Sequence, residues 1–216
     1  MKIAQGCTSW IVTPFLAGIF FTILFILFDG TLIGGVCLFI SFILLLVTGF
    51  FILFFRDPER TIENGIVAPA DGRIREINNI TDPALGDCTL ISTFMNVYNV
   101  HINRMPLEGT IKDIIHISGG YLPAFKKESE KNERVVIVID TKIGTIKIVQ
   151  IAGTLARRIV TYVKKGDEQK KGDKIGIIRF GSRVDIYVPT KKVKQISVNV
   201  NDRIKAGEDT IAEINA

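Results

Sequence analysis

Trp10–Phe28 (WIVTPFLAGIFFTILFILF) and Thr31–Phe55 (TLIGGVCLFISFILLLVTGFFILFF) decide the architecture, because neither stretch contains a charged residue. An α-helix needs roughly 20 predominantly apolar residues to cross the hydrocarbon core of a bilayer, and both stretches are long enough. Asp29-Gly30 between them is a turn signal, too short for anything but a tight hairpin. The sequence therefore predicts two transmembrane helices, with residues 1–55 as a membrane anchor.

Two alternatives exist for these apolar stretches. The first stretch resembles a signal peptide only in part. Its start carries the single charge of Lys2, no small-residue cleavage site precedes Asp29, and a second apolar stretch follows at once. The other alternative is a long hairpin buried inside a soluble core.

The basic residues that flank the apolar stretches predict their orientation. Lys2 precedes the first stretch, Arg56 and Arg60 follow the second, and the turn carries only Asp29. Because Lys and Arg favour the cytoplasmic side of a membrane, we expect both ends to face the cytoplasm. Residues 56–216 then form a cytoplasmic domain of a multi-pass membrane protein.

Composition narrows the classes of function. The 216 residues carry 27 Lys and Arg against 22 Asp and Glu, a net charge of +5. This excess suits binding to an anionic membrane surface, to which each nearby basic residue contributes about 1 kcal/mol of attraction. Alternatively, the basic residues are part of an ordinary solvated surface. Basic patches with interleaved aromatic residues are absent, which argues against nucleic acid as a partner. Three cysteines without a C-x-x-C pair and two isolated histidines predict neither a disulfide framework nor a metal site.

After Arg56 the long apolar stretches give way to short ones, rich in Ile, Val, Thr and Phe and bounded by Gly, Pro, Asp and Asn. Such runs are typical of β-strands. They predict a mainly β domain, a barrel or sandwich with few short helices; residues 121–133 suit either a short helix or an exposed loop. The expected strands are Ile66–Ala68, Arg73–Ile77, Thr89–Phe94, Val135–Asp140, Gly144–Ile151, Gly176–Phe180, Val184–Val188 and Ile196–Val200.

Repeated turn signals refine this expectation. Lys164–Asp167 (KKGD) is followed six residues later by Lys170–Asp173 (KKGD), and Ala68–Gly72 (APADG) is a third turn. Together they resemble the barrel-sandwich hybrid of biotinyl and lipoyl carriers. The characteristic carrier lysine is missing from the sequence.

Four places can carry chemistry: Asp71 in its turn, His101 near a strand end, the Arg157-Arg158 pair and Gly181-Ser182. Asp71 could instead cap its own turn, and His116 looks like an alternating strand position. An Asp, a His and a Ser permit a relay in which the carboxylate orients the imidazole and the imidazole takes the hydroxyl proton. Because no G-x-S-x-G is present, the Ser182 hydroxyl is better suited to attack the carbonyl of Gly181, whose missing Cβ leaves that carbonyl accessible.

Five motifs in order resemble the short, archaeal-type phosphatidylserine decarboxylases, a pyruvoyl-dependent family that includes archaetidylserine decarboxylases. The likeness covers nearly the whole of residues 56–216 and extends to the apolar N-terminal region. The motifs are Phe55–Arg60, Ala68–Gly72, Val100–Pro106, Gln150–Gly153 with Ala156–Ile159, and Gly176–Asp185.

The resemblance implies a self-processing enzyme. Ser182 attacks Gly181, β-elimination releases a β chain of residues 1–181, and residue 182 loses ammonia to become a pyruvoyl group at the start of an α chain, 182–216. The two chains stay together as a heterodimer, with further oligomerisation possible. The ketone forms a Schiff base with the serine amine of the lipid and accepts electrons as carbon dioxide leaves. The product is the ethanolamine phospholipid.

The resemblance also implies site residues. Asp71 and His101 would assist self-cleavage, and His101 could also donate the proton after decarboxylation. Arg157, Arg158 and Arg183 are candidates for the headgroup. The chain departs from its bacterial and mitochondrial relatives, which carry two histidines in the motif and a Leu-Gly-Ser-Thr cleavage site. Here Arg104 stands near the second histidine position, so His101 would serve both tasks.

Two other classes of function remain. One is a membrane-tethered β-barrel adaptor without catalysis, and the other is a membrane serine protease that uses Ser182 and His101. A lipid-modifying enzyme agrees best with the two apolar stretches, because a lipid leaves the bilayer at a cost of roughly 0.8 kcal/mol per CH₂.

Overall fold

A computed structural model describes residues 2–120, 122, 131–153, 158–179 and 182–215. The chain divides into two compact units, Met1–Pro58 and Glu59–Ala216. Each unit is described by itself.

The first unit is a helical hairpin. Helix α1 spans Thr8–Leu27 and helix α2 spans Leu32–Phe54, each within three residues of the predicted boundaries. The Thr31 hydroxyl caps α2 by accepting a hydrogen bond from the backbone N–H of Gly34 at 3.1 Å. Two short strands, β1 (Lys2–Ile3) and β2 (Arg56–Asp57), pair antiparallel at the base of the hairpin.

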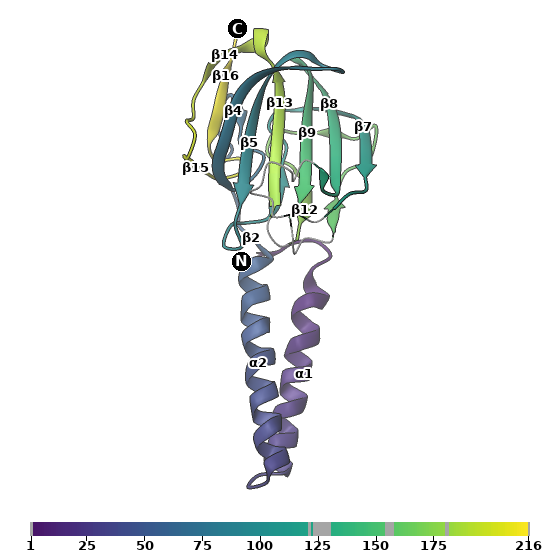
Figure 1. The fold of residues 1–216 in the computed structure, drawn as a ribbon, viewed down its shortest axis with the longest axis vertical. Coiled ribbons are helices and arrows are strands. Elements are labelled where there is room, and N and C mark those ends of the chain that lie inside the picture. The colour runs from purple at the N-terminus through teal and green to yellow at the C-terminus, as the bar shows by residue number, and fades with distance from the viewer. Residues whose placement is uncertain (1, 121, 123–130, 154–157, 180–181, 216) are drawn as a thin grey trace. The chain divides into compact units, whose positions relative to one another are not determined.

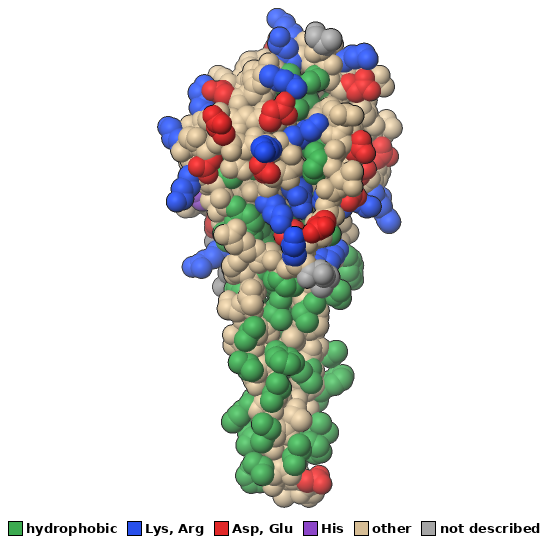
Figure 2. Space-filling model, turned by 180° about the vertical axis from the view of Figure 1, so that it is seen from behind, with side chains coloured by type: hydrophobic (Ala, Val, Ile, Leu, Met, Phe, Trp, Pro, Cys, Tyr) green, Lys and Arg blue, Asp and Glu red, His purple; other side chains and the backbone are tan. Residues whose placement is uncertain are grey.

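Small and hydroxyl side chains hold the two helices together. The Ser41 hydroxyl donates to the Gly18 carbonyl at 2.9 Å and lies 2.7 Å from the Thr22 hydroxyl. Both helices are long and apolar enough to cross a membrane, and hydrophobic side chains cover their outer surface (Figure 2). This pattern is the reverse of a soluble core hairpin, in which the apolar side chains would be buried.

The second unit is built from antiparallel β-strands, as predicted (Figure 1). Its main sheet is curled like half a barrel and has the strand order β11-β7-β8-β9-β13-β5-β4-β15. These strands are β4 (Gly72–Asp82), β5 (Gly86–Met95), β7 (Gly109–Ile117), β8 (Arg134–Thr141), β9 (Gly144–Ala152), β11 (Glu168–Gln169), β13 (Ser182–Pro189) and β15 (Arg203–Ile204).

Two three-stranded sheets complete the unit. One has the order β10-β12-β6, from Ile159–Thr161, Lys174–Ile178 and Ile102–Arg104. The other has the order β14-β16-β3, from Val193–Ile196, Thr210–Ile214 and Ile66–Val67. A 3-10 turn, η2 (Thr190–Lys192), joins β13 to β14.

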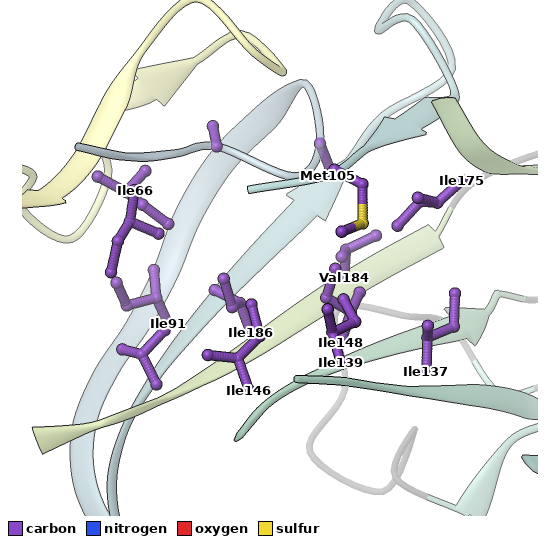
Figure 3. Packing of buried hydrophobic residues seen from close by; sticks show 14 of the residues in the cluster. Ile66, Ile91, Met105, Ile137, Ile139, Ile146, Ile148, Ile175, Val184 and Ile186 are labelled. Carbon is purple, nitrogen blue, oxygen red and sulfur yellow. The ribbon is translucent and has the colours of Figure 1, made fainter. Parts of the chain in front are cut away.

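The core contains side chains from all three sheets. Ile91, Ile148 and Ile186 come from the main sheet, while Ile66 and Ile175 come from the smaller ones (Figure 3). Strand β13 lies between β9 and β5, and its alternate residues from Val184 to Val188 enter this core. The fold thus places the start of β13 inside the unit.

The two predicted KKGD turns are equivalent in the structure. The carboxylate of Asp167 accepts a hydrogen bond from the backbone N–H of Lys164 at 2.8 Å, and that of Asp173 accepts one from Lys170 at 2.7 Å. Gly166 and Gly172 have φ of 91° and 86°, a region that favours glycine.

Most predicted strands are confirmed, with corrections at the edges. The strand predicted at Ile196–Val200 is wrong beyond Ile196, because β14 ends there. Strand β7 was not among the predicted strands, although His116 was recognised as an alternating position; the strand contains a bulge between Ile111 and Asp113. The helix considered for residues 121–133 lies largely outside the described residues.

Candidate active site

Ser182 occupies the first position of β13 and is fully buried. It pairs with Met95, the last residue of β5, and with Ala152, the last residue of β9. Its backbone is therefore fixed on both sides by neighbouring strands, and its hydroxyl cannot meet bulk solvent.

The Ser182 hydroxyl contacts a thioether, which in turn contacts the first of two linked, buried amides. The Ser182 hydroxyl lies 3.2 Å from the Met95 sulfur, and the side-chain amide nitrogen of Asn103 lies 3.7 Å from the same sulfur. Asn103 in turn accepts a hydrogen bond from Gln150 at 2.7 Å. Asn103 and Gln150 are fully buried, and the Gln150 carbonyl oxygen has no hydrogen-bond partner among the described residues.

Asp71 makes long-range contacts instead of capping its own turn. One carboxylate oxygen accepts from the Arg60 guanidinium at 2.8 Å, and the other accepts from the backbone N–H of Ala206 at 2.8 Å. Burial raises the pKa of Asp71 above its usual value, and Arg60 together with the N–H groups of Ala206 and Val100 offsets this only in part. Asp71 is thus held in place and remains a better base than an exposed aspartate.

Close packing against β5 explains why the turn carries a glycine at position 72. A Cβ at this position would lie 2.2 Å from the carbonyl oxygen of Phe94 in β5. Only glycine lets the backbone that carries Asp71 approach β5 so closely.

His101 is fully buried between β5 and β6, and its Nδ1 lies 2.9 Å from the Asn99 carbonyl oxygen. A carbonyl only accepts hydrogen bonds, so Nδ1 carries a proton in this contact. In the neutral ring Nε2 is then the basic nitrogen.

The three candidate catalytic residues follow or adjoin the end of β5. Ser182 pairs with its last residue, Asp71 directly precedes the strand that pairs with Phe94, and His101 follows β5 after a short turn. Ser182 contacts Met95, and Asp71 accepts a hydrogen bond from the backbone of Val100, the neighbour of His101. The topology therefore gathers residues that are up to 111 positions apart in the sequence, since Asp71 and Ser182 differ by 182 − 71.

The predicted arginines have different surroundings. Arg183 is buried and makes a bidentate ion pair with Asp185 at 2.8 and 2.7 Å. Arg158 is exposed. Arg157 and Gly181 lie outside the described residues.

Three side chains had no role in the site assigned from the sequence: Arg60, which served only to predict orientation, Asn103 and Gln150. All of them lie inside motifs that carried the family resemblance, so the signal was present as residue identity. Their roles depend on contacts across 11 to 47 positions, which no local pattern reveals.

A β unit that buries a serine, an imidazole and a carboxylate beside one strand end, on a chain with a long apolar hairpin, has the features of a membrane-associated enzyme. The sequence model of the family described as phosphatidylserine decarboxylase matches residues 47–212. The chain belongs to this family and is accordingly a carboxy-lyase.

The curated relatives agree with this assignment. A protein of Methanococcoides burtonii, provisionally named archaetidylserine decarboxylase proenzyme, is 42% identical over 98% of this chain and 96% of its own length. A Methanosarcina barkeri protein with the same name is 39% identical over 98% of each chain. The phosphatidylserine decarboxylase proenzyme of Streptomyces avermitilis is 48% identical over 74% of this chain and 70% of its own.

Proposed function

We propose that this chain is a self-processing, pyruvoyl-dependent enzyme that decarboxylates a serine phospholipid to the ethanolamine phospholipid. The observation that carries the proposal is the position of Ser182: it is fully buried at the start of a central strand, and its hydroxyl contacts the Met95 sulfur, which Asn103 also contacts. The names of the relatives, which are proenzymes of archaetidylserine or phosphatidylserine decarboxylases, support the same substrate class.

Self-cleavage would use the chain's own groups. The Ser182 oxygen attacks the Gly181 carbonyl, the peptide becomes an ester, and elimination across residue 182 releases the Gly181 carboxylate. Hydrolysis of the resulting dehydroalanine frees ammonia and leaves the pyruvoyl group. His101 would take the serine proton on Nε2, and Asp71 would stabilise the charge that develops nearby.

The surroundings of Ser182 fit a ketone. The Asn103 amide nitrogen lies 3.7 Å from a thioether sulfur, which is a weak acceptor. A carbonyl oxygen on residue 182 would be a better acceptor for this nitrogen, and the apolar core excludes water. A pyruvoyl group would supply an electron-withdrawing carbonyl for the loss of carbon dioxide. His101 would then return a proton to the headgroup carbon.

The hairpin would anchor the enzyme in the membrane that holds its substrate. We propose that both helices span the bilayer and that residues 56–216 face the cytoplasm, on the side of Arg56 and Arg60. The pair of archaetidylserine-named relatives matches almost the whole chain, hairpin region included, which favours archaetidylserine as the natural lipid.

The substitution Ser182→Ala tests the proposal. We expect the purified variant to remain one chain of 24.0 kDa and to release no carbon dioxide from phosphatidylserine or archaetidylserine, because the hydroxyl that starts the chemistry is gone. Wild-type protein should separate into two fragments on a denaturing gel. Carbon dioxide release by the alanine variant would refute the role of Ser182.

The same purified proteins distinguish the proposed enzyme from the two other classes of function, the adaptor and the serine protease. An adaptor would give an uncleaved wild-type chain. A serine protease would react with a fluorophosphonate at Ser182, whereas full burial of this residue predicts no labelling.

A further inference from the structure

A cavity of about 460 Å³ adjoins Asp71 and has basic walls. Its lining includes Arg73 of β4, Arg203 of β15 and Lys205, together with Asn96 and Asn99 from the turn that follows β5. The volume falls in the range of small-molecule sites, roughly 300–1,000 Å³. None of these cations was a candidate from the sequence.

Arg73 and Arg203 are arranged unfavourably for a protein without a ligand. They are directly opposite each other in the β4–β15 pair, and both are exposed. Like charges at directly opposite positions destabilise a sheet. In the part of the chain that the structure describes, neither guanidinium has an ion pair with a carboxylate. An anion between them would convert the repulsion into binding.

The carboxylates in the lining already have partners. Asp71 is bound by Arg60 and Ala206, and Asp209 accepts a hydrogen bond from the backbone N–H of Lys205 at 2.6 Å. Of the cations in the lining, Lys205 is also paired, because its ammonium lies 3.1 Å from Glu208. The two arginines therefore remain as the available cations of the cavity.

The cavity lies at a suitable distance from Ser182. Met95 contacts the Ser182 hydroxyl, and the next residue, Asn96, lines the cavity. Ser182 and Arg73 are on strands two positions apart, so their backbones are separated by about 10 Å. Arg73 pairs with Phe94 and Ser182 with Met95, so the two side chains leave opposite faces of the sheet, and a headgroup would pass the strand end at Asn96 to reach residue 182. In a serine phospholipid four bonds, about 5 Å, separate the amine nitrogen from phosphorus, and an arginine side chain spans about 6 Å.

We propose that the Arg73–Arg203 cavity binds the phosphodiester of the serine headgroup. The guanidinium groups donate charge-assisted hydrogen bonds to the phosphate oxygens, as Arg side chains do at phosphate sites. The amine and carboxylate of the headgroup then extend toward residue 182. This assignment rests on the proposed function and adds the element that selects a phosphorylated serine over free serine.

Binding can be measured without the proposed chemistry. In the full chain carrying Ser182→Ala, purified in detergent, glycerophosphoserine is titrated and binding is followed by NMR or calorimetry. The double variant R73Q/R203Q should raise its Kd at least about tenfold, because two charge-assisted contacts are lost. The control K112Q/K142Q removes the same charge from exposed residues and should change the Kd less than about twofold.

Two results would overturn the proposal. One is unchanged glycerophosphoserine affinity in R73Q/R203Q. The other is inorganic phosphate binding as tightly as glycerophosphoserine, which would make the cavity a general phosphate site. The single variant R203Q, at the sheet edge, serves if the double variant misfolds.

An activity assay separates this inference from the proposed function. In the cleavable chain, R73Q/R203Q should still form both fragments, yet need a higher lipid concentration for half-maximal rate. If the wild type formed no fragments, the proposed function would be refuted. The glycerophosphoserine titration would still test the cavity.

Discussion

Two opposing effects act on the pKa of Asp71. Burial raises the pKa of its carboxyl, and Arg60 lowers it through a hydrogen bond and through charge. Among the described residues Arg60 pairs with Asp71 and Glu208, so its expected role is to position Asp71 and to stabilise its carboxylate form.

Arg60→Gln should move the pH dependence of self-cleavage. Loss of the positive charge raises the pKa of Asp71 further, so the carboxylate forms only at higher pH. The acidic limb of the cleavage rate should therefore shift to higher pH, as measured from fragment formation on gels across a pH series. Lys194→Gln, an exposed change, is the control. An unshifted profile in Arg60→Gln would remove Arg60 from the site.

Asn103 and Thr93 allow a matched comparison of buried polar groups. Asn103→Leu leaves the Gln150 amide without its acceptor and should cost about 1–3 kcal/mol of unfolding free energy, with slower fragment formation. The Thr93 hydroxyl is buried with no hydrogen-bond partner in the described residues. Thr93→Val should therefore keep or raise stability and leave cleavage unchanged. Equal behaviour of the two variants in denaturant titration and on gels would contradict the assignment of Asn103.

At the scale of elements, the Asp82 turn shows how a hairpin is tied to its sheet. Asp82 ends β4, accepts hydrogen bonds from the N–H groups of Ala84 and Leu85 at 3.0 and 3.1 Å, and forms an ion pair with Lys147 of β9. Burial would raise the pKa of Asp82, but these partners lower it overall.

Asp82→Asn should reduce stability in a pH-dependent way. Because the folded pKa is lower than the unfolded one, the carboxylate stabilises the fold above the ordinary aspartate value and loses this effect as pH falls through the folded pKa. We expect a loss of about 1–2 kcal/mol at neutral pH that disappears in acid. Thermal unfolding of the wild type and of Asp82→Asn at several pH values measures this loss. A difference that persists at acidic pH would show that charge is not its cause.

The elements also show what a sequence can and cannot predict. The two helices and strands such as β8 and β9 follow from apolar length and alternation, and the KKGD turns follow from glycine and aspartate at fixed positions. The order of strands does not: β13 pairs with β5 across 87 positions between Ser182 and Met95, a pairing that only tertiary packing decides. For this reason Ser182 could be named from the sequence, while its neighbours Met95, Asn103 and Gln150 could not.

At the scale of the whole molecule, an apolar hairpin and a β unit with a buried serine share one chain. The hairpin suits a substrate with lipid tails, and the β unit suits chemistry that must exclude water. Membership of the decarboxylase family accounts for both features, and the Arg73–Arg203 cavity would hold the phosphate of the headgroup.

The intact mass of the detergent-purified protein tests the central proposal most directly. We predict two chains, residues 1–181 and 182–216, with the smaller one lighter than its unmodified sequence by the mass of one ammonia, as a pyruvoyl start requires. An active protein that remains a single chain, or a smaller fragment that begins with an unmodified serine, would contradict the account.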